Sequence, residues 1–419
     1  MTQKYTFPKR FLWGASTSAH QVEGGNHNQW TVSELEHAKT RAVQAAHQLG
    51  HLPIWNEIKQ EASRPSNYVS GRASDHYRRY EEDSAILSQL NMNAFRFGIE
   101  WSRIEPEEGK WDMAEIEHYR MVLTALKKRG IEPMVTLFHW TMPVWFAEKG
   151  GFEKKRNVDY FVRFAEKILD ELGGHVRLVC TINEPEVYVS YGWLSDGSWP
   201  PHKRAQYLQG MWVYWNLARA HNRVAKMAHK KSRRYKCGIS KNCADHYDGD
   251  HSIKSKLVIR IVQYGADYWF LNRIRRHMDW LGVNYYFANR YVGGRVSNEN
   301  IRTNDLGWDM QPDRLEYVLK RLYAVYKKPI IVTESGVADR NDQYRRWWIA
   351  HSIAAIHSAM QSGVKVLGYL HWSLLDNFEW AYGKWPRFGL VEVDYTTQAH
   401  TVRPSAVWYG KVIKKLRGV

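Results

Sequence analysis

Short apolar runs alternate with helical patterns along most of this chain. Brief runs of apolar and β-branched residues between longer segments are typical of buried strands. Eight such runs predict strands at residues 11–14, 94–99, 133–138, 178–182, 236–240, 280–284, 329–333 and 366–371. Apolar residues at intervals of three and four predict helices at residues 112–130, 157–173, 315–325 and 349–363. Each of these helices precedes a predicted strand, as a crossover helix between parallel strands should.

The alternation predicts an α/β fold, and two arrangements would produce it. An open, doubly wound sheet has a similar pattern, but the count of eight strands favours a closed (β/α)8 TIM barrel. Polar and aromatic residues also gather where the predicted strands end, and barrel enzymes carry their active sites at this C-terminal rim. No low-complexity linker interrupts residues 1–419, so we expect one barrel domain over the whole chain. The pattern of residues 29–71 is less regular, and we expect a long connecting segment with helical turns at the rim of the barrel there.

Two glutamates stand directly after apolar strands. Glu184 lies in the segment Thr-Ile-Asn-Glu-Pro at the end of the fourth strand, and Glu334 lies in Val-Thr-Glu-Ser-Gly at the end of the seventh. A closed barrel places these two strand ends across from one another. Two carboxyl groups about 5–5.5 Å apart are what double-displacement glycoside hydrolysis requires. A single glutamate at a strand end is more often a solvated partner in a salt bridge, so the surrounding motifs decide between the two interpretations.

The surrounding motifs resemble those of family 1 β-glycosidases. Seven segments follow the order of that family, at residues 11–24, 95–103, 137–140, 182–185, 282–286, 333–336 and 371–380, the last followed by Arg-Phe-Gly at 387–389. Each segment alone is a weak signal, but together they cover nearly the whole chain. Residues around Trp308, 334–339 and 368–376 look most similar to archaeal-type members. The resemblance implies a retaining β-glycosidase of glycoside hydrolase family 1.

The resemblance also implies roles for individual residues. Glu334 would be the nucleophile and Glu184 the acid/base, with Arg96 and Tyr286 donating hydrogen bonds to Glu334 and Asn284 lying near the pair. Those donors would keep the nucleophile ionised, whereas fewer donors would leave Glu184 with a raised pKa.

The substrate-binding residues follow from the same motifs. The hydroxyl groups of the terminal sugar would bond Gln21, His139, Asn183, Glu379 and Trp380, while Trp372 would be the stacking floor, Phe388 would line the pocket, and Trp308 with the loop 192–201 would border the aglycone.

The sequence departs from the family pattern at two places. Ser335 follows the nucleophile where the family usually has asparagine, so support for the Glu334 loop should be weaker. The interval between Asn242 and Trp280 is shorter than expected, which should open the aglycone side.

Composition and charge exclude several functions. The chain has 20 Trp and 25 Tyr, and aromatic faces suit sugar rings, although most of these residues should serve the core. The formal net charge is +17, but the basic residues are dispersed, so we expect no nucleic-acid partner. Three cysteines without a CxxC motif, no signal-peptide pattern and no run of 18 apolar residues predict a cytoplasmic protein with no membrane partner. Neither a metal-ligand cluster nor a phosphate-binding glycine-rich loop appears, so we expect no metal and no cofactor.

The expected partner is a small-molecule β-glycoside. We expect hydrolysis of terminal β-D-glycosyl residues, of glucose, galactose or fucose, from oligosaccharides or from aryl and alkyl glycosides. The alternatives are a 6-phospho-β-glycosidase, which the positive charge would favour, a transglycosidase, and a catalytically inactive sugar-binding protein. Both carboxylates are present, which argues against an inactive protein. A carboxylate at Glu379 would repel a 6-phosphate, and the single Lys384 nearby would not offset it.

Overall fold

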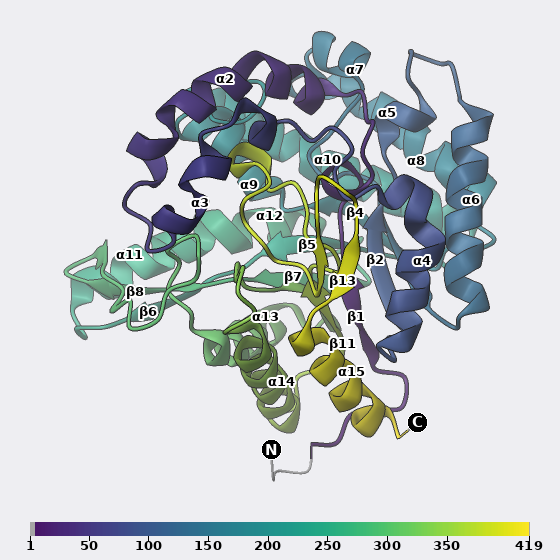
Figure 1. Ribbon diagram of the computed structural model, residues 1–419. Coiled ribbons are helices and arrows are strands. Elements are labelled where there is room, and N and C mark those ends of the chain that lie inside the picture. The colour runs from purple at the N-terminus through teal and green to yellow at the C-terminus, as the bar shows by residue number, and fades with distance from the viewer. Residues whose placement is uncertain (1–4, 419) are drawn as a thin grey trace.

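The computed structural model describes residues 5–418, and its centre is a closed barrel of eight parallel strands (Figure 1). Around the barrel the strand order is β1-β11-β10-β7-β5-β4-β3-β2. Their bounds are β1 (Leu12–Ser16), β2 (Ala94–Gly98), β3 (Glu132–Thr136), β4 (Leu178–Asn183), β5 (Lys236–Asn242), β7 (Trp280–Tyr285), β10 (Ile330–Ser335) and β11 (Val366–Trp372). Each predicted strand is present, and the predicted barrel is confirmed.

Helices surround the barrel and cover its rim (Figure 1). Their bounds are α1 (Ala19–Val22), α2 (Gln29–Leu49), α3 (Trp55–Ala62), α4 (His76–Gln89), α5 (Trp101–Ile104), α6 (Met113–Lys128), α7 (Val144–Glu148), α8 (Val158–Leu172), α9 (Pro185–Val189), α10 (Tyr207–Lys231), α11 (Ile253–Gln263), α12 (Trp269–Ile274), α13 (Leu315–Tyr326), α14 (Arg345–Gln361) and α15 (Pro404–Arg417). Short 3-10 turns are η1 (Pro65–Tyr68), η2 (Gly151–Glu153), η3 (Lys155–Asn157), η6 (Pro312–Arg314) and η7 (Trp380–Tyr382), and π-helical turns are η4 (Ser190–Leu194) and η5 (Tyr264–Tyr268). Within residues 5–418, no helix has both the length and the hydropathy that a bilayer crossing requires.

The four predicted helices are α6, α8, α13 and α14, and each buries most of its apolar stripe. In α8 the side chains of Phe161, Phe164 and Ile168 are fully buried. Burying side chains of this size contributes about 1.5–3 kcal/mol each, so the stripe fixes which face of the helix meets the strands. The remaining strands form two small sheets outside the barrel: β6 (Asp245–Asp248), β8 (Ala288–Val292) and β9 (Arg295–Val296) in one, β12 (Val391–Val393) and β13 (His400–Val402) in the other.

The segment 29–71 is more regular than its sequence pattern predicts, because it forms the 21-residue helix α2, then α3 and η1. A capping box starts α2: the Asn28 side chain accepts hydrogen bonds from the Trp30 and Thr31 backbone amides, and the Thr31 hydroxyl accepts one from the Asn28 amide at 2.8 Å. Of the seven buried residues of α2, Ser33 and Glu34 are polar and three are alanines, including Ala38 and Ala42. Such small residues give a weak apolar period, which explains why the prediction underestimated this helix.

Candidate active site

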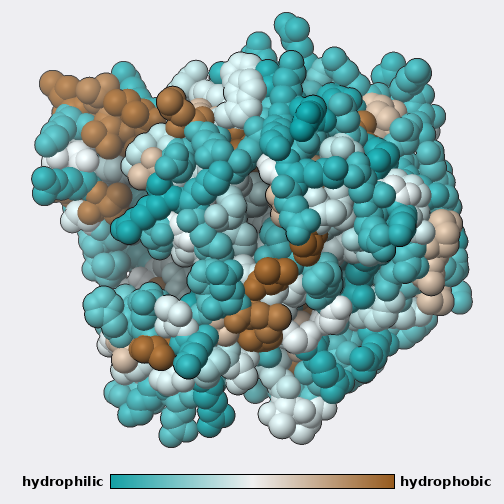
Figure 2. Space-filling model, turned by 90° about the horizontal axis from the view of Figure 1, so that it is seen from above, coloured by the Kyte–Doolittle hydropathy of each residue, from teal (hydrophilic) through white to brown (hydrophobic). Residues whose placement is uncertain are grey.

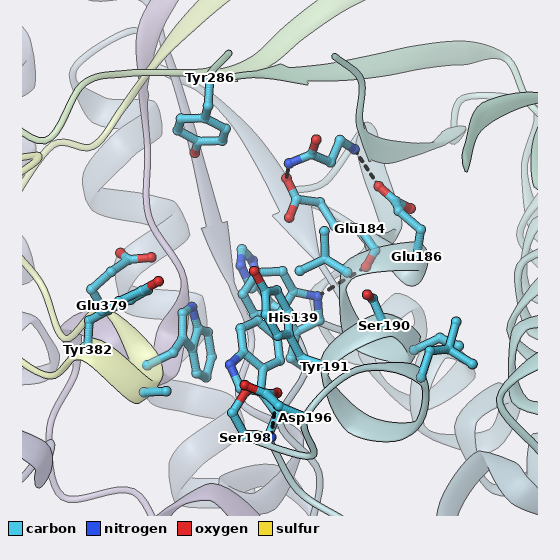
Figure 3. A pocket seen from close by; sticks show the side chains of 18 of the residues that line it. His139, Glu184, Glu186, Ser190, Tyr191, Asp196, Ser198, Tyr286, Glu379 and Tyr382 are labelled. Carbon is cyan, nitrogen blue, oxygen red and sulfur yellow. Dashed lines mark hydrogen bonds between the residues drawn. The ribbon is translucent and has the colours of Figure 1, made fainter. Parts of the chain in front are cut away.

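A cavity of about 680 Å³ opens at the carboxyl ends of the barrel strands and contains both predicted catalytic glutamates. Figure 3 shows Glu184, Tyr286 and Glu379 reaching into this space from different sides. Four glutamates and one aspartate line the cavity, namely Glu184, Glu186, Glu334, Glu379 and Asp196. Among residues 5–418, no lysine or arginine belongs to its lining. The cavity is therefore acidic, although the chain as a whole is strongly basic.

Glu184 stands where β4 ends and α9 begins. Its backbone amide donates to the Ser240 carbonyl of β5 at 2.8 Å, and this bond holds the residue at the barrel mouth. The carboxylate accepts hydrogen bonds from the Asn284 side-chain amide at 2.8 Å and from that of Asn242 at 3.3 Å. The hydroxyl of Thr333 donates to the Asn284 carbonyl oxygen at 2.7 Å, so the amide end of Asn284 must face Glu184. Both donors are neutral, and they leave the carboxyl without a cation in contact.

Glu334 has a different set of partners. The Tyr286 hydroxyl donates to its carboxylate at 2.6 Å, and the guanidinium of Arg96 forms a buried ion pair with its other oxygen. Arg96 is fully buried on β2, and it also donates to Asn183 at 2.6 Å and to Thr136 at 3.0 Å. One guanidinium thus ties together β2, β3, β4 and β10 and fixes the position of the Glu334 carboxylate.

These surroundings separate the proton affinities of the two glutamates. Burial raises the pKa of both carboxyl groups. The Arg96 charge and the Tyr286 hydrogen bond lower the pKa of Glu334 in part, whereas the charges of Glu334 and Glu186 raise that of Glu184 further. Glu184 therefore holds a proton more tightly than Glu334, which is the difference that an acid and a nucleophile require.

His139 presents a single unbonded donor to the cavity. Asn183 accepts at its carbonyl oxygen from Arg96 at 2.6 Å and from Asn284 at 3.1 Å, so its amide group must point at the His139 Nε2, 3.1 Å away. Burial and the nearby Arg96 charge lower the pKa of His139, and the ring is neutral. Its proton then lies on Nδ1, which has no hydrogen-bond partner in the structure. A buried donor without a partner is costly, and a ligand hydroxyl would satisfy it.

The predicted sugar-binding residues meet around this donor. Gln21 donates to the Glu379 carboxylate at 3.3 Å and to Asn377 at 3.0 Å. The rings of Trp372 and Trp380 lie 6.0 and 6.2 Å from that of His139. Burial and the Glu334 charge raise the pKa of Glu379 to about 8. The cavity is lined by Gln21, His139, Tyr286, Trp308, Trp372, Glu379, Trp380 and Phe388 together with Glu184 and Glu334, while Arg96, Asn183 and Asn284 lie behind these.

The sequence analysis missed a buried charge cluster next to Glu184. The Glu186 carboxylate accepts from the Lys241 ammonium at 2.8 Å and from the Asn242 backbone amide at 2.8 Å. Asn242 therefore bridges Glu186 and Glu184, as the dashed lines in Figure 3 show. The prediction ended this strand at residue 240, but β5 continues to Asn242, and that extension places both polar residues at the rim. The signal in the sequence was the polar pair Lys241 and Asn242, which directly follows the predicted strand 236–240.

Ser335, the residue after Glu334, faces away from the cavity. The Ser335 hydroxyl is buried and accepts a hydrogen bond from the indole nitrogen of Trp348 on α14 at 3.0 Å. This bond anchors the end of β10 to the helix layer. Gly336 follows, and a Cβ there would lie 1.8 Å from the Trp372 carbonyl oxygen, so no side chain fits between these two segments. The loop is thus held by close packing as well as by hydrogen bonds.

One side-chain group outside the cavity has the residue types of a metal site: His229, Cys237 and Asp279. The His229 Nε2 lies 2.7 Å from an Asp279 oxygen that also accepts from the Cys237 backbone amide at 2.7 Å. Two ligands bonded to one zinc ion at about 2.0–2.2 Å each lie farther apart than this. Burial also raises the pKa of the Cys237 thiol to about 12. The geometry therefore favours a hydrogen-bonded histidine–aspartate pair.

Comparison with known proteins gives consistent matches. A model of the family described as "Glycosyl hydrolase family 1" matches residues 3–274 and 265–417. Beta-glucosidase A of Thermotoga maritima is 30% identical over 456 residues, which cover 97% of this chain and 98% of that protein. A β-glycosidase structure from Pyrococcus horikoshii is 33% identical with a TM-score of 0.85, covering 99% of this chain and 96% of that one. A chloroplastic galactolipid galactosyltransferase of Arabidopsis thaliana is 30% identical over 364 residues, 80% of this chain and 57% of that protein.

Proposed function

Because the chain belongs to glycosyl hydrolase family 1, we propose that it is a retaining β-glycosidase in which Glu334 is the nucleophile and Glu184 the acid/base. The family predicted from the motifs is confirmed, and the chain is accordingly a glycoside hydrolase. The observation that carries the assignment of roles is the contrast between the two carboxylates. Glu334 is bonded to a guanidinium and a phenol, whereas Glu184 has only neutral amide donors.

The reaction follows in two steps. The Glu334 carboxylate attacks the anomeric carbon as the glycosidic C–O bond breaks, and Glu184 gives its proton to the departing oxygen. This leaves a glycosyl ester on Glu334 and an ionised Glu184. Burial and the Glu334 charge together raise the pKa of Glu184, and the ester removes that charge because it is neutral. The pKa of Glu184 is then lower, and its ionised carboxylate can take a proton from water. That water attacks the anomeric carbon and releases Glu334, with the β configuration retained.

The substrate is proposed to be an uncharged, non-reducing terminal β-D-glycosyl residue such as glucose, galactose or fucose, linked to an oligosaccharide or to an aryl or alkyl group. Support comes from the acidic lining of the cavity, which within residues 5–418 contains no lysine or arginine that could bind a phosphate. Lys384 is not among the residues that line the cavity, and its ammonium lies 5.6 Å from the centre of the Tyr395 ring. Within residues 5–418, the cavity lining therefore has no lysine or arginine to bind the substrate of a 6-phospho-β-glycosidase.

A transglycosidase is the second candidate, because a glycosyl ester on Glu334 reacts with an alcohol as it reacts with water. The similarity to a galactolipid galactosyltransferase favours keeping this candidate. The ratio of transfer product to free sugar, measured with an added alcohol acceptor, separates the two activities.

The test of the main proposal is covalent labelling with a 2-deoxy-2-fluoro β-glucoside, which slows hydrolysis of the glycosyl ester. Peptide mapping should find the label on Glu334, and Glu334→Gln should take up none and lose several orders of magnitude in rate. Glu186 is the internal control, since it is a carboxylate in the same cavity with no proposed chemical role. A label on Glu186, or no label on an enzyme that turns over the substrate, would contradict the assignment.

A further inference from the structure

Exposed apolar side chains gather on two helices beside the mouth of the cavity. We call this surface the apolar rim, and it comprises Tyr207, Leu208, Met211, Trp212 and Trp215 on α10, Ile253, Leu257 and Ile261 on α11, and Tyr264 on η5. Leu208 is 89% exposed and Ile253 is 86% exposed. In Figure 2, brown side chains gather at the upper left of the face seen from above, the side on which Figure 1 places α11. Contiguous exposed apolar side chains of this size mark an interaction site.

The exposed face of α11 carries an apolar stripe with cations on both sides. Ile253, Leu257 and Ile261 recur every four residues, and on an ideal helix they fall within an arc of about 80°. Cations flank this arc on both sides: Lys254 on one, Lys256 and Arg260 on the other. The helix contains no acidic residue, and its buried face consists of Ser255 and Ile259. An apolar stripe between rows of cations is typical of helices that lie at the surface of an anionic membrane.

The α10 part of the apolar rim has aromatic residues in contact with arginines. The Arg219 guanidinium lies 5.1 Å from the ring centre of Trp212 and 5.5 Å from that of Trp215, and Arg273 lies 4.6 Å from Trp215. No acidic residue occurs in α10 either. Tryptophan at a surface beside cations suits the boundary between lipid headgroups and acyl chains, where the ring is amphipathic and the cation meets a phosphate.

The apolar rim is continuous with the cavity. Met211 is exposed on the rim and also lines the cavity, as do Gly265 and Ala266, which follow Tyr264 on η5. Helix α10 meets η5, which directly follows α11, at this point, because the Tyr214 hydroxyl on α10 donates to the Ala266 carbonyl at 3.4 Å. A chain leaving Glu184 on the aglycone side would therefore pass Met211 and emerge onto apolar surface.

We propose that the apolar rim docks this protein on an anionic phospholipid bilayer and admits glycosides whose aglycone is a long alkyl chain or lipid held in that bilayer. The second part rests on the proposed β-glycosidase function, whereas the first does not. Docking requires no helix that crosses the membrane. A second copy of the chain is a poorer occupant, because self-pairing of this surface would bring Lys254, Lys256 and Arg260 against the same cations. An anionic headgroup layer instead complements them.

The docking test is flotation of the purified protein with vesicles of phosphatidylcholine containing phosphatidylglycerol. Leu257→Glu with Ile261→Glu places two carboxylates at positions that are 57% and 62% exposed, so the fold should tolerate both. The bound fraction should require the anionic lipid, and the double variant should bind at least tenfold more weakly. The matched control is Met121→Glu on α6, which is 45% exposed and lies on the opposite side of the barrel in Figure 1. It should bind like the unchanged protein.

Activity measurements separate docking from chemistry. The double variant should cleave soluble p-nitrophenyl β-glucoside at the unchanged rate, but dodecyl β-glucoside in anionic vesicles at least tenfold more slowly. If no glycoside is cleaved while vesicle binding still depends on the apolar rim, the docking surface stands and the proposed function fails. Equal vesicle binding by the double variant and the unchanged protein would overturn the docking proposal. A dimer in solution that the double substitution dissociates, with no vesicle binding, would assign the surface to a second copy instead.

Discussion

Replacing Tyr286 with phenylalanine tests how the structure keeps Glu334, the proposed nucleophile, ionised. The substitution removes one hydroxyl group, which donates to the Glu334 carboxylate at 2.6 Å. Both residues line the cavity, and the Arg96 ion pair with Glu334 remains in place. The change therefore deletes a single charge-assisted hydrogen bond at nearly constant shape.

The expected size follows from the geometry. A hydrogen bond to a charged group contributes about 1.5–3 kcal/mol, and the Tyr286 bond favours the ionised form of Glu334, because it lowers the pKa of that carboxyl group. Since one pKa unit corresponds to about 1.4 kcal/mol, the pKa of Glu334 should rise by about one to two. The direction is upward because the lost bond had lowered it. Glu334 must be ionised to attack, so activity should be lost at the acidic end of the pH range.

The assay is kcat/KM for an aryl β-glucoside as a function of pH. Its acid limb reports the first proton to leave the coupled carboxyl pair in the free enzyme. In Tyr286→Phe this limb should move to higher pH by about one to two units, while the alkaline limb, which reports Glu184, moves less. The matched control is Tyr285→Phe, which removes a hydroxyl that donates to the Gln311 backbone carbonyl at 2.6 Å, away from both carboxylates.

The control should leave the acid limb where it is. An unmoved limb in Tyr286→Phe would show that the hydroxyl does not stabilise the charged nucleophile. Equal movement in both variants would show that the shift comes from a general loosening of β7.

Two further predictions concern the cavity. Glu184→Ala should retain most glycosylation activity on substrates with activated leaving groups, and azide should restore turnover and yield the β-glycosyl azide; an α-azide, or no rescue, would argue against the acid/base role. p-Nitrophenyl β-glucoside should have a far higher kcat/KM than its 6-phosphate. The reason is that Glu379 lies in an acidic cavity whose lining, within residues 5–418, has no lysine or arginine. Equal kcat/KM values, or a preference for the 6-phosphate, would place Glu379 outside the first sugar site.

Periodicity predicted the barrel because the strands and most of each helical stripe are buried, although Val325 near the end of α13 is 54% exposed. The eight apolar runs lie in the barrel, and the stripe on α8 packs inward. Site residues such as Gln21, Trp308 and Phe388 came from resemblance to the family. Physical pattern alone identified only carboxylates at strand ends, without their partners.

Two features escaped prediction for identifiable reasons. The stripe of Ile253, Leu257 and Ile261 has the period of a buried face, yet the structure exposes it. Periodicity gives the spacing of apolar residues but not the side from which neighbouring elements pack. The Glu186–Lys241 ion pair depends on where β5 ends, and strand ends are the least determined part of a pattern.

The sequence pattern also did not predict the backbone conformation of the site, which places the side chains that line the cavity. Trp140, Glu184 and Trp380 all line the cavity with positive φ angles of 74°, 40° and 50°. Each such conformation costs about 1 kcal/mol or more for a residue with a side chain, so it persists only where neighbouring contacts hold it. At Glu184, the turn is held by the hydrogen bond from the Glu184 backbone amide to the Ser240 carbonyl. The Trp140 indole also donates to the carbonyl of the preceding residue, Asn183, at 3.0 Å. The left-handed turn lets the chain leave β4 for α9 while the carboxyl group stays in the cavity. Glu184, the proposed acid/base, is therefore positioned by a strained turn that β5 and Trp140 stabilise, in addition to the hydrogen bonds that its carboxylate accepts from Asn284 and Asn242.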